Sequence, residues 1–458
     1  YDVIDAIEAL HDRAMLQRKD GSDEVRFSMY ETIRTYALER LAEEERESAQ
    51  RRHCHYFTGR AEKLTAFELY EAARYKRNGR LFEIEGDDML AAHNWALKTN
   101  IELAARLAVA MLPYLVERVA PTLRRRVFDE TVRLSRGAID ENLFCRLLSR
   151  RSRLNRTLGA MKLAVEDANE CLVIAKRLGV KEVEAECLIS RGVANIHFHK
   201  MKEAEEDIRQ ALTLAKEIKH NALESLALAG LANVVMRQGD MDGARGHFEE
   251  VVRRCRAANN HGAEAKHLGC LAFIAWHEGQ EEDAHAFYQR SISLHEEVGN
   301  RVGLAFAQQN YAEMLAVLDK TDEALPLIKC SMASIREIGM NYADYGPTLT
   351  LGLLELKKGN KDEAIRLAKA ALEKAAEVEE RLWVSIIYYY LAFIHAQRDE
   401  VSEAEACLGE SSKWTATDGL PSEELVLVHG FIDLAQARAL LLQGGDEASA
   451  QVADLLAK

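Results

Sequence analysis

Seven alanines recur every forty residues along most of this chain, and this spacing constrains the fold more than any other feature. They are Ala164, Ala204, Ala244, Ala284, Ala324, Ala364 and Ala404, and Ala448 follows forty-four residues later. Five residues before them stand Gly159, His199, Gly239, Gly279, Asp319, Gly359 and Asp399, which are mostly residues that end a helix. Twelve residues before and seven after each alanine the side chains are small, apart from one valine. A fixed period of this length predicts a stack of similar units.

Each unit is predicted to be a hairpin of two helices. In "ANVVMRQGDMDGARGHFEEVVRRCRAANN" a first helix should end near Gln238, a turn should cover 239–242, and a second helix should begin around Asp242. The small side chains allow close helix contact, while glycine and aspartate at the turn end and cap helices. With five prolines and 48% hydrophobic residues, the composition predicts an almost entirely helical chain. Pro326 should interrupt one backbone hydrogen bond inside a second helix.

The register of small residue, turn, alanine and small residue resembles the tetratricopeptide repeat in its longer, forty-residue form. The resemblance covers 144–420 in seven units, with an eighth in "FIDLAQARALLLQGGDEASAQVADLLAK". It implies an all-α, right-handed superhelical solenoid of about seven to eight hairpins over 144–458. The aromatic residue of the consensus first helix is absent from every unit, so each unit is divergent. Armadillo and HEAT repeats have similar lengths but lack this register.

The front of the chain lacks the forty-residue period. "RFSMY" alternates polar and apolar residues like a short strand, and "ETIRTYALERLAEEE" is predicted to be a helix with Ile33, Tyr36, Ala37 and Leu41 on one face. A helix, a strand and a helix in this order resemble the C-terminal part of a winged-helix domain, which we place at 1–45. A helical bridge of atypical capping repeats is expected at 46–143.

Three segments of this front region, "RFSMYETIRTYALERL", "RRHCHYF" and "FEIEGDDMLAAHNWAL", occur in that order before the repeats. Together they resemble the region after the nucleotide-binding core of bacterial STAND ATPases, signalling proteins that end in repeat sensors. In that family a Met-His-Asp triplet contacts the nucleotide, and the matching residues here are Met29, Tyr30 and Glu31. A phenol cannot become cationic as an imidazole can, so Tyr30 could only donate a hydrogen bond. The alternative is that Met29 and Tyr30 pack in a small core.

No G-x-x-x-x-G-K-[ST] loop occurs in these residues. The resemblance therefore implies that an ATPase module, with its ATP or ADP, precedes Tyr1, and that this region is itself neither an enzyme nor a cofactor-binding unit. A first residue other than methionine fits the expectation that the chain is a piece of a longer protein. No carboxylate stands in a setting that would tune it for catalysis.

The resemblance also implies a ligand surface, because tetratricopeptide arrays bind on the concave side formed by their first helices. The corresponding positions lie eleven and seven residues before the register alanine, and they supply the candidates Arg153, His197, Asn233, Arg237, Phe273, His277, Glu313 and Phe393. Their mixture of polar and aromatic groups favours a protein or peptide ligand, with a small molecule as the alternative. The other interpretation is that each residue only packs or is solvated.

Residues 121–156 contain ten arginines and four acidic residues. The candidates for an anion or partner patch are Arg124, Arg125, Arg126, Arg146, Arg150 and Arg153. Arg146, Arg150 and Arg153 would share one helical face, where guanidinium groups can hold phosphate or carboxylate. An acidic face of the ATPase module is a second partner for this patch. Ion pairs with the next repeat are the alternative.

Charge, hydropathy and cysteine spacing exclude several classes of protein. The net charge of −14 disfavours general adhesion to nucleic acid or anionic lipid, and no run of 18 apolar residues predicts a membrane span. Eight cysteines without a C-x-x-C pattern predict reduced, buried thiols of a cytoplasmic bacterial protein. The pairs His53/His55 and His197/His199 would point about 200° apart on a helix, so we predict no metal site.

These patterns predict the regulatory region of a STAND-type signalling protein. An activator bound on the concave surface would shift the population towards an open, oligomerising state and so control the upstream ATPase module. Two alternatives remain: a stand-alone adaptor that recruits proteins, and a DNA-binding regulator that uses the winged helix and the arginine-rich segment.

Overall fold

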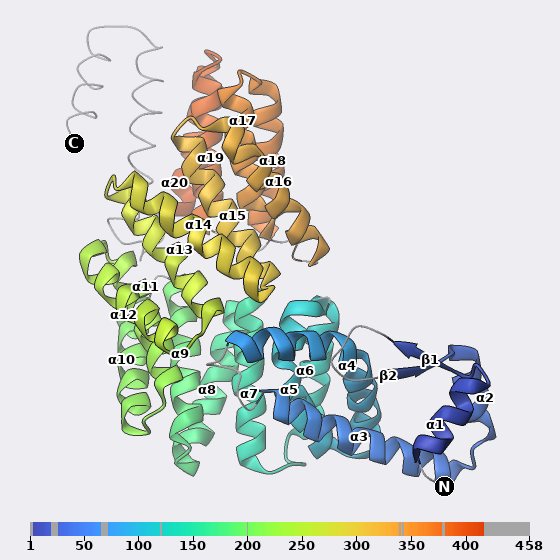
Figure 1. The fold of residues 1–458 in the computed structure, drawn as a ribbon. Coiled ribbons are helices and arrows are strands. Elements are labelled where there is room, and N and C mark those ends of the chain that lie inside the picture. The colour runs from blue at the N-terminus through green and yellow to red at the C-terminus, as the bar shows by residue number, and fades with distance from the viewer. Residues whose placement is uncertain are drawn as a thin grey trace, which may run out of the picture.

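The structure is a computed structural model that describes residues 3–19, 26–65, 72–119, 121–198, 200–338, 340, 343–377 and 381–415. Over these ranges the chain forms helices and one two-stranded sheet (Figure 1). The front elements are α1 (Val3–Asp12), β1 (Leu16–Lys19), β2 (Arg26–Met29), α2 (Glu31–Arg40), α3 (Glu43–Thr65), α4 (Ala72–Thr99), α5 (Ile101–Arg118) and α6 (Pro121–Ser135). None of the helices within the described ranges is long and apolar enough to cross a membrane.

Seven helical hairpins follow the front region. Their first helices are α7 (Glu141–Thr157), α9 (Lys181–His197), α11 (Asn221–Arg237), α13 (His261–His277), α15 (Arg301–Val317), α17 (Tyr345–Lys357) and α19 (Arg381–Ala396). Their second helices are α8 (Met161–Leu178), α10 (Met201–Glu217), α12 (Met241–Ala257), α14 (Glu281–Val298), α16 (Thr321–Glu337), α18 (Lys361–Glu377) and α20 (Val401–Thr415). Every second helix begins forty residues after the one before, which confirms the predicted period. α16 continues through Pro326. The eighth predicted unit lies outside the described residues.

The residues of the forty-residue register are buried at the alanine positions and left-handed at the turn positions. All seven alanines of the register are at most 1% exposed. Five residues earlier, the described residues of the set all have a positive φ: Gly159, Gly239, Gly279, Asp319, Gly359 and Asp399. A left-handed residue at this point ends the first helix and reverses the chain. His199 lies outside the described residues.

Small side chains hold the helices of the array close together. A Cβ atom on Gly192 would lie 2.7 Å from Cγ1 of Ile208, so only hydrogen fits there. Seven residues after the register alanine, Ser291 Oγ donates to the carbonyl of Ala265 at 2.7 Å and Ser331 Oγ to that of Ala305 at 2.8 Å. The sequence predicted only the small size of these serines, and the structure adds a hydrogen bond between the two helices of a hairpin.

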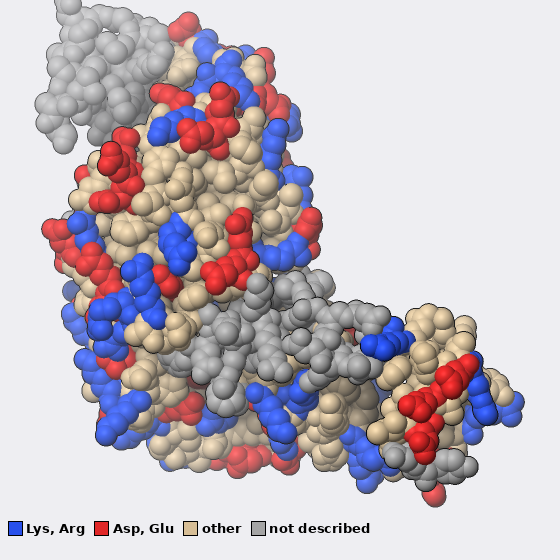
Figure 2. Space-filling model, viewed as in Figure 1, with Lys and Arg blue, Asp and Glu red and all other residues tan. Residues whose placement is uncertain are grey.

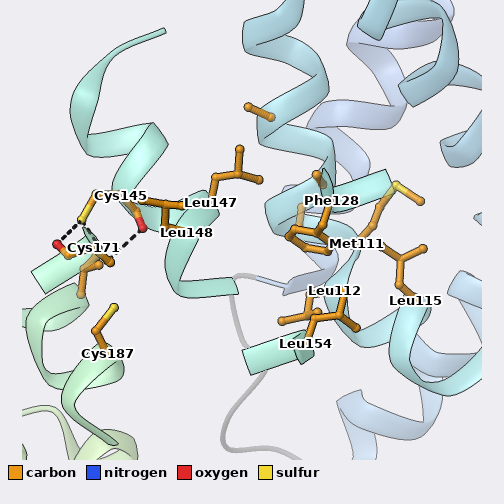
Figure 3. Close-up of a cluster of buried hydrophobic side chains, with 14 of the residues drawn as sticks. Met111, Leu112, Leu115, Phe128, Cys145, Leu147, Leu148, Leu154, Cys171 and Cys187 are labelled. Carbon is orange, nitrogen blue, oxygen red and sulfur yellow. Dashed lines mark hydrogen bonds between the residues drawn. The ribbon is translucent and has the colours of Figure 1, made fainter. Parts of the chain in front are cut away.

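The helical bridge shares its core with the first repeats. Met111 and Leu115 of α5 and Phe128 of α6 belong to the same buried cluster as Leu147 and Leu148 of α7 (Figure 3). The cluster also includes Cys145 and Cys171, whose sulfur atoms are 3.2 Å apart, and Cys187. The hydrogen bond with Cys145 and, after it, burial raise the pKa of Cys171, so its thiol stays protonated.

The eight cysteines are free, but they are not uniformly buried as predicted. Cys54 and Cys255 are buried with the three thiols of the core cluster, whereas Cys330 is exposed because it points away from the packed face of α16. Cys270 and Cys407 are intermediate.

The front end differs from its prediction at one junction. The strand predicted in "RFSMY" is confirmed as β2, which pairs antiparallel with β1 so that Met29 lies opposite Leu16. The predicted helix 31–45 is divided, because the backbone is extended at Leu41 and α3 begins at Glu43. Acidic residues in the first turn of α3 favour a helix start there, since they face the positive end of the helix dipole. Neither α1 nor α2 contains a buried residue, so the winged helix stays a prediction.

Candidate functional site

The first helices of the hairpins line the inner side of the stack. α7 contacts α9, α9 contacts α11, α13 contacts α15 and α15 contacts α17, whereas neighbouring second helices pack less closely. In a curved stack the closer layer lies inside the curve, so the first helices form the inner wall. α11 and α13 are the exception, because they meet mainly through α12. The stack therefore bends at this point (Figure 1).

The array contacts the front region of the chain and so forms a closed arrangement of helices. α4 contacts α14, although nine helices separate them along the sequence, and α4 also packs on α5, which contacts α7. The helices α4, α5, α7, α9, α11, α12, α13 and α14 thus form a closed series of contacts, which we call the ring. Figure 1 shows α4 crossing between the lower part of the molecule and the upper part of the array. Both α7 and α13 belong to this ring.

Three cations from these two helices share one electrostatic environment. Burial lowers the pKa of Arg156 on α7 to about 10, and the neighbouring charge of Arg153 contributes. Burial also lowers the pKa of Lys266 on α13, with contributions from Arg156 and Arg153. Lys266 nevertheless touches solvent.

These three cations, which we call the inner cation cluster, lack acidic partners. No ion pair joins Arg153, Arg156 or Lys266 to a carboxylate of the described residues. The Nε atom of Arg156 is buried without a hydrogen-bond acceptor. Arg153 was predicted for both the concave surface and the anion patch, whereas Arg156 and Lys266 were not predicted. No sequence pattern marks Lys266 as a site residue, because lysines are common near the start of amphipathic helices.

Most of the other arginines in the predicted anion patch already have partners within the chain. The alternative interpretation predicted such ion pairs with the next repeat. Arg146 pairs with Glu182 at 3.3 Å and Arg150 pairs with Glu186 at 3.2 Å, both on the next hairpin. Arg124 is 1% exposed and donates to the carbonyl of Val119. The prediction that these three arginines form one exposed patch is therefore wrong. Arg125 and Arg126 remain exposed on α6.

The predicted concave residues are distributed over six first helices. Phe273 and His277 contact each other on α13, with ring centroids 4.2 Å apart. Asn233 donates its side-chain amide to the carbonyl of Ala229 at 2.7 Å, so part of its hydrogen-bonding capacity is used within α11. His197 and Arg237 are half-buried.

The two remaining concave residues lie further along the array. Phe393 is half-buried and packs against the cluster of Leu356 and Ile394, which favours a role in packing. Glu313 on α15 is half-buried, and burial raises its pKa to about 7. Tyr288 is adjacent, since the charge of Glu313 contributes to raising the pKa of that phenol, after burial. The hydroxyl of Tyr288 has no hydrogen-bonding partner.

The predicted nucleotide-sensing triplet lies apart from these residues. Met29 ends β2, Tyr30 precedes α2, and Glu31 pairs with Arg34 at 3.8 Å. Tyr30 is 43% exposed, so it does not pack in a core within the described front elements. Over the described residues no three His, Cys, Asp or Glu side chains are grouped so that they could hold a metal ion.

A pocket formed by three helices contrasts with the inner cation cluster. It is lined by Glu249, Val252, Arg253, Arg256, Leu268, Leu271 and Phe287, from α12, α13 and α14. Both of its arginines are neutralised, Arg253 by Glu250 and Arg256 by Glu264, each at 2.6 Å. The face of the array in Figure 2 likewise shows basic and acidic residues interspersed. The arginines of the inner cation cluster form no such ion pair within the described part of the chain.

Residues 223–297 match the family model described as tetratricopeptide repeat. Proteins of Mycobacterium tuberculosis and Mycobacterium bovis that carry the provisional name HTH-type transcriptional regulator are 25% identical over 187 residues. That alignment covers 39% of this chain and 21% of the relatives, so the chain matches about a fifth of their length.

Several solved structures share the architecture. The apo form of the quorum sensor NprR from B. thuringiensis gives a TM-score of 0.53 at 14% identity, over 78% of this chain and 98% of that one. A Rap protein complexed with competence and sporulation factor gives 0.51 at 12% identity, over 79% and 99%. A STAND protein with a tetratricopeptide-repeat sensor from Pyrococcus horikoshii gives 0.43 at 13% identity, over 82% and 58%, which is too low to support an argument. The array described here therefore has the fold of a tetratricopeptide-repeat protein.

Proposed function

We propose that this chain is the ligand-binding regulatory region of a STAND-type signalling protein. The inner wall binds an activating protein or peptide, and binding controls an ATPase module that precedes the chain and holds the ATP or ADP. The observation that carries this proposal is the inner cation cluster. Partly buried charges without partners cost free energy, and they are retained where a ligand supplies the missing countercharge. In this proposal the region catalyses nothing itself, and ligand binding favours an oligomer.

The comparisons support the ligand class. NprR is named a quorum sensor, and the Rap protein was solved with a bound factor. Both share only the fold with this chain, so a ligand on the inner wall here is an inference from architecture and from the unpaired charges. A peptide fits an inner wall that offers cations on α7 and an aromatic pair, Phe273 and His277, on α13.

Peptide display on the purified 458-residue chain tests the proposal. Selected peptides should bind the variant Phe273→Ala/His277→Ala at least about tenfold more weakly than the unchanged chain, which is about 1.4 kcal/mol. Arg253→Ala, at an exposed and ion-paired position of α12, is the matched control and should bind as the unchanged chain does. Equal binding by all three proteins, with unchanged circular dichroism, would remove the inner wall from the site.

The link to an ATPase has its own test. A Walker A loop encoded before Tyr1, and a change in ATP hydrolysis of the longer protein when a selected peptide is added, are the expected results. If peptides bind but no such loop is encoded, the chain acts as an adaptor. The DNA-binding alternative is weakened because Arg124 is buried and Arg146 and Arg150 are paired.

A further inference from the structure

The inner cation cluster joins residues of two helices that lie more than a hundred residues apart in the sequence. Both α7 and α13 belong to the ring. Arg153 and Arg156 are one turn apart on α7, and their charges act on Lys266 of α13. Arg153 and Lys266 are exposed to solvent and Arg156 is half-buried, so the inner cation cluster is accessible to a ligand from solution.

Among the described residues, no ion pair compensates this charge. On α9, Glu182 and Glu186 already pair with Arg146 and Arg150. His267 and His295, which sense the charge of Lys266, are neutral at pH 7, because burial lowers their pKa values to about 3 and about 4. The two guanidinium groups therefore keep their positive charges, and a protonated Lys266 adds a third, within a chain whose net charge is −14.

Two guanidinium groups and one ammonium group define what can bind. A guanidinium donates two parallel hydrogen bonds to a pair of oxygen atoms, whereas an ammonium acts as a compact point charge. The buried Nε of Arg156 still lacks an acceptor. A singly charged carboxylate would leave two charges uncompensated, while a group with about two negative charges, such as phosphate, would neutralise most of the cluster.

We propose that Arg153, Arg156 and Lys266 form a binding site for a doubly charged oxyanion, either a phosphate or a pair of carboxylates, carried by the ligand of the inner wall. This proposal deepens the proposed function and rests on it for the identity of the ligand. Binding of the bare oxyanion requires only the three side chains, so it can be measured without knowing the ligand.

Calorimetric titration of the 458-residue chain tests the site. Inorganic phosphate and succinate are the two doubly charged probes, and acetate is the singly charged one, all at constant ionic strength set with sodium chloride. We expect binding of phosphate or succinate at a stoichiometry of one, at least about tenfold tighter than acetate. The probe that binds more tightly distinguishes phosphate from paired carboxylates. Equal affinity for all three probes would overturn the proposal.

Variants separate a specific site from general ion effects. Arg156→Gln/Lys266→Gln should weaken binding at least about tenfold, whereas Arg253→Gln on α12 should not change it. The double variant should also melt at a higher temperature than the unchanged chain, because it removes like charges that repel each other. A lower melting temperature together with unchanged oxyanion affinity would show that these residues act only in packing.

The oxyanion titration and the peptide experiment test the cation site and the proposed function separately. If no oxyanion binds while selected peptides still require Phe273 and His277, the cation site is wrong and the proposed function stands. If the oxyanion binds through the cluster but no peptide binds the inner wall, the site stands and the proposed function is wrong.

Discussion

His267 shows how a single residue can set the pH response of this array. It is 5% exposed, its ring lies 5.9 Å from that of Phe248, and its Nδ1 atom has no hydrogen-bonding partner. Burial lowers its pKa to about 3, with a contribution from the charge of Lys266. In the unfolded chain the same imidazole takes up a proton near pH 6.5. The folded state should therefore lose stability as the pH falls from about 6.5 towards about 3.

Replacing this residue should reduce the acid sensitivity. Between pH 7 and pH 5 the lowered pKa of His267 corresponds to about 2 kcal/mol of lost stability. His267→Gln keeps a polar side chain of similar size that does not titrate, so its loss over this range should be smaller by about that amount. Urea denaturation at the two pH values measures this. His55→Gln, at an exposed position, is the control and should leave the pH dependence unchanged.

Glu313 gives the opposite pH dependence. Burial raises its pKa to about 7, so the folded state holds a proton that the unfolded state has already lost above pH 4.5. The contribution of Glu313 to stability is therefore complete below pH 4.5 and is lost as the pH rises through about 7. Glu313→Gln should stabilise the protein at pH 8 by roughly 1 kcal/mol, a value reduced because water reaches the side chain. Equal urea midpoints for the variant and the unchanged chain at pH 8 would contradict this.

At the scale of elements, the forty-residue register determined where helices begin, end and touch. Left-handed residues at the turns and small residues at the contacts act over a few positions, so the sequence reveals them directly. The break between α2 and α3 was missed, because the first-turn acids that favour a new helix start at Glu43 were included in one long amphipathic helix. The hydrogen bonds of Ser291 and Ser331 were also missed, since size alone does not indicate them.

The helix contact at Gly192 can be tested by adding one methyl group. Gly192→Ala would place Cβ 2.7 Å from Cγ1 of Ile208 and 3.1 Å from the carbonyl oxygen of Ala204. The crowding should lower the free energy of unfolding by about 1–3 kcal/mol. Gly246→Ala is the matched control, since it is an exposed helical glycine with no atom within 4 Å of the added Cβ, and it should be neutral or stabilising by about 1 kcal/mol. Chemical denaturation measures both variants.

At the scale of the whole molecule, most contacts between the described helices join neighbours or next neighbours in the sequence. The contact of α4 with α14 departs from this pattern and closes the ring. A destabilising substitution in such an array should promote unfolding of the hairpins near it and leave distant hairpins unaffected. The reason is that each hairpin depends mainly on the hairpins beside it.

Hydrogen exchange on an overpacked variant tests this local behaviour. Ala324 is fully buried in a cluster with Tyr288, Ile328 and Leu354, so Ala324→Leu should strain that cluster. Amide protection should decrease in α13 to α18, while α7 to α10 keep their protection. A uniform decrease over all described helices would instead indicate one cooperative unit.

The sequence by itself determined the repeat fold and the hairpin boundaries, because these depend on interactions within about forty residues. Only the tertiary structure decided which arginines form ion pairs. Arg146 and Arg150 are neutralised by the next hairpin, whereas Arg153 and Arg156 form no ion pair among the described residues and act electrostatically on Lys266. The position of α13 relative to α7 depends on the small rotation from each hairpin to the next, added over several units, and no local pattern in the sequence encodes such a sum.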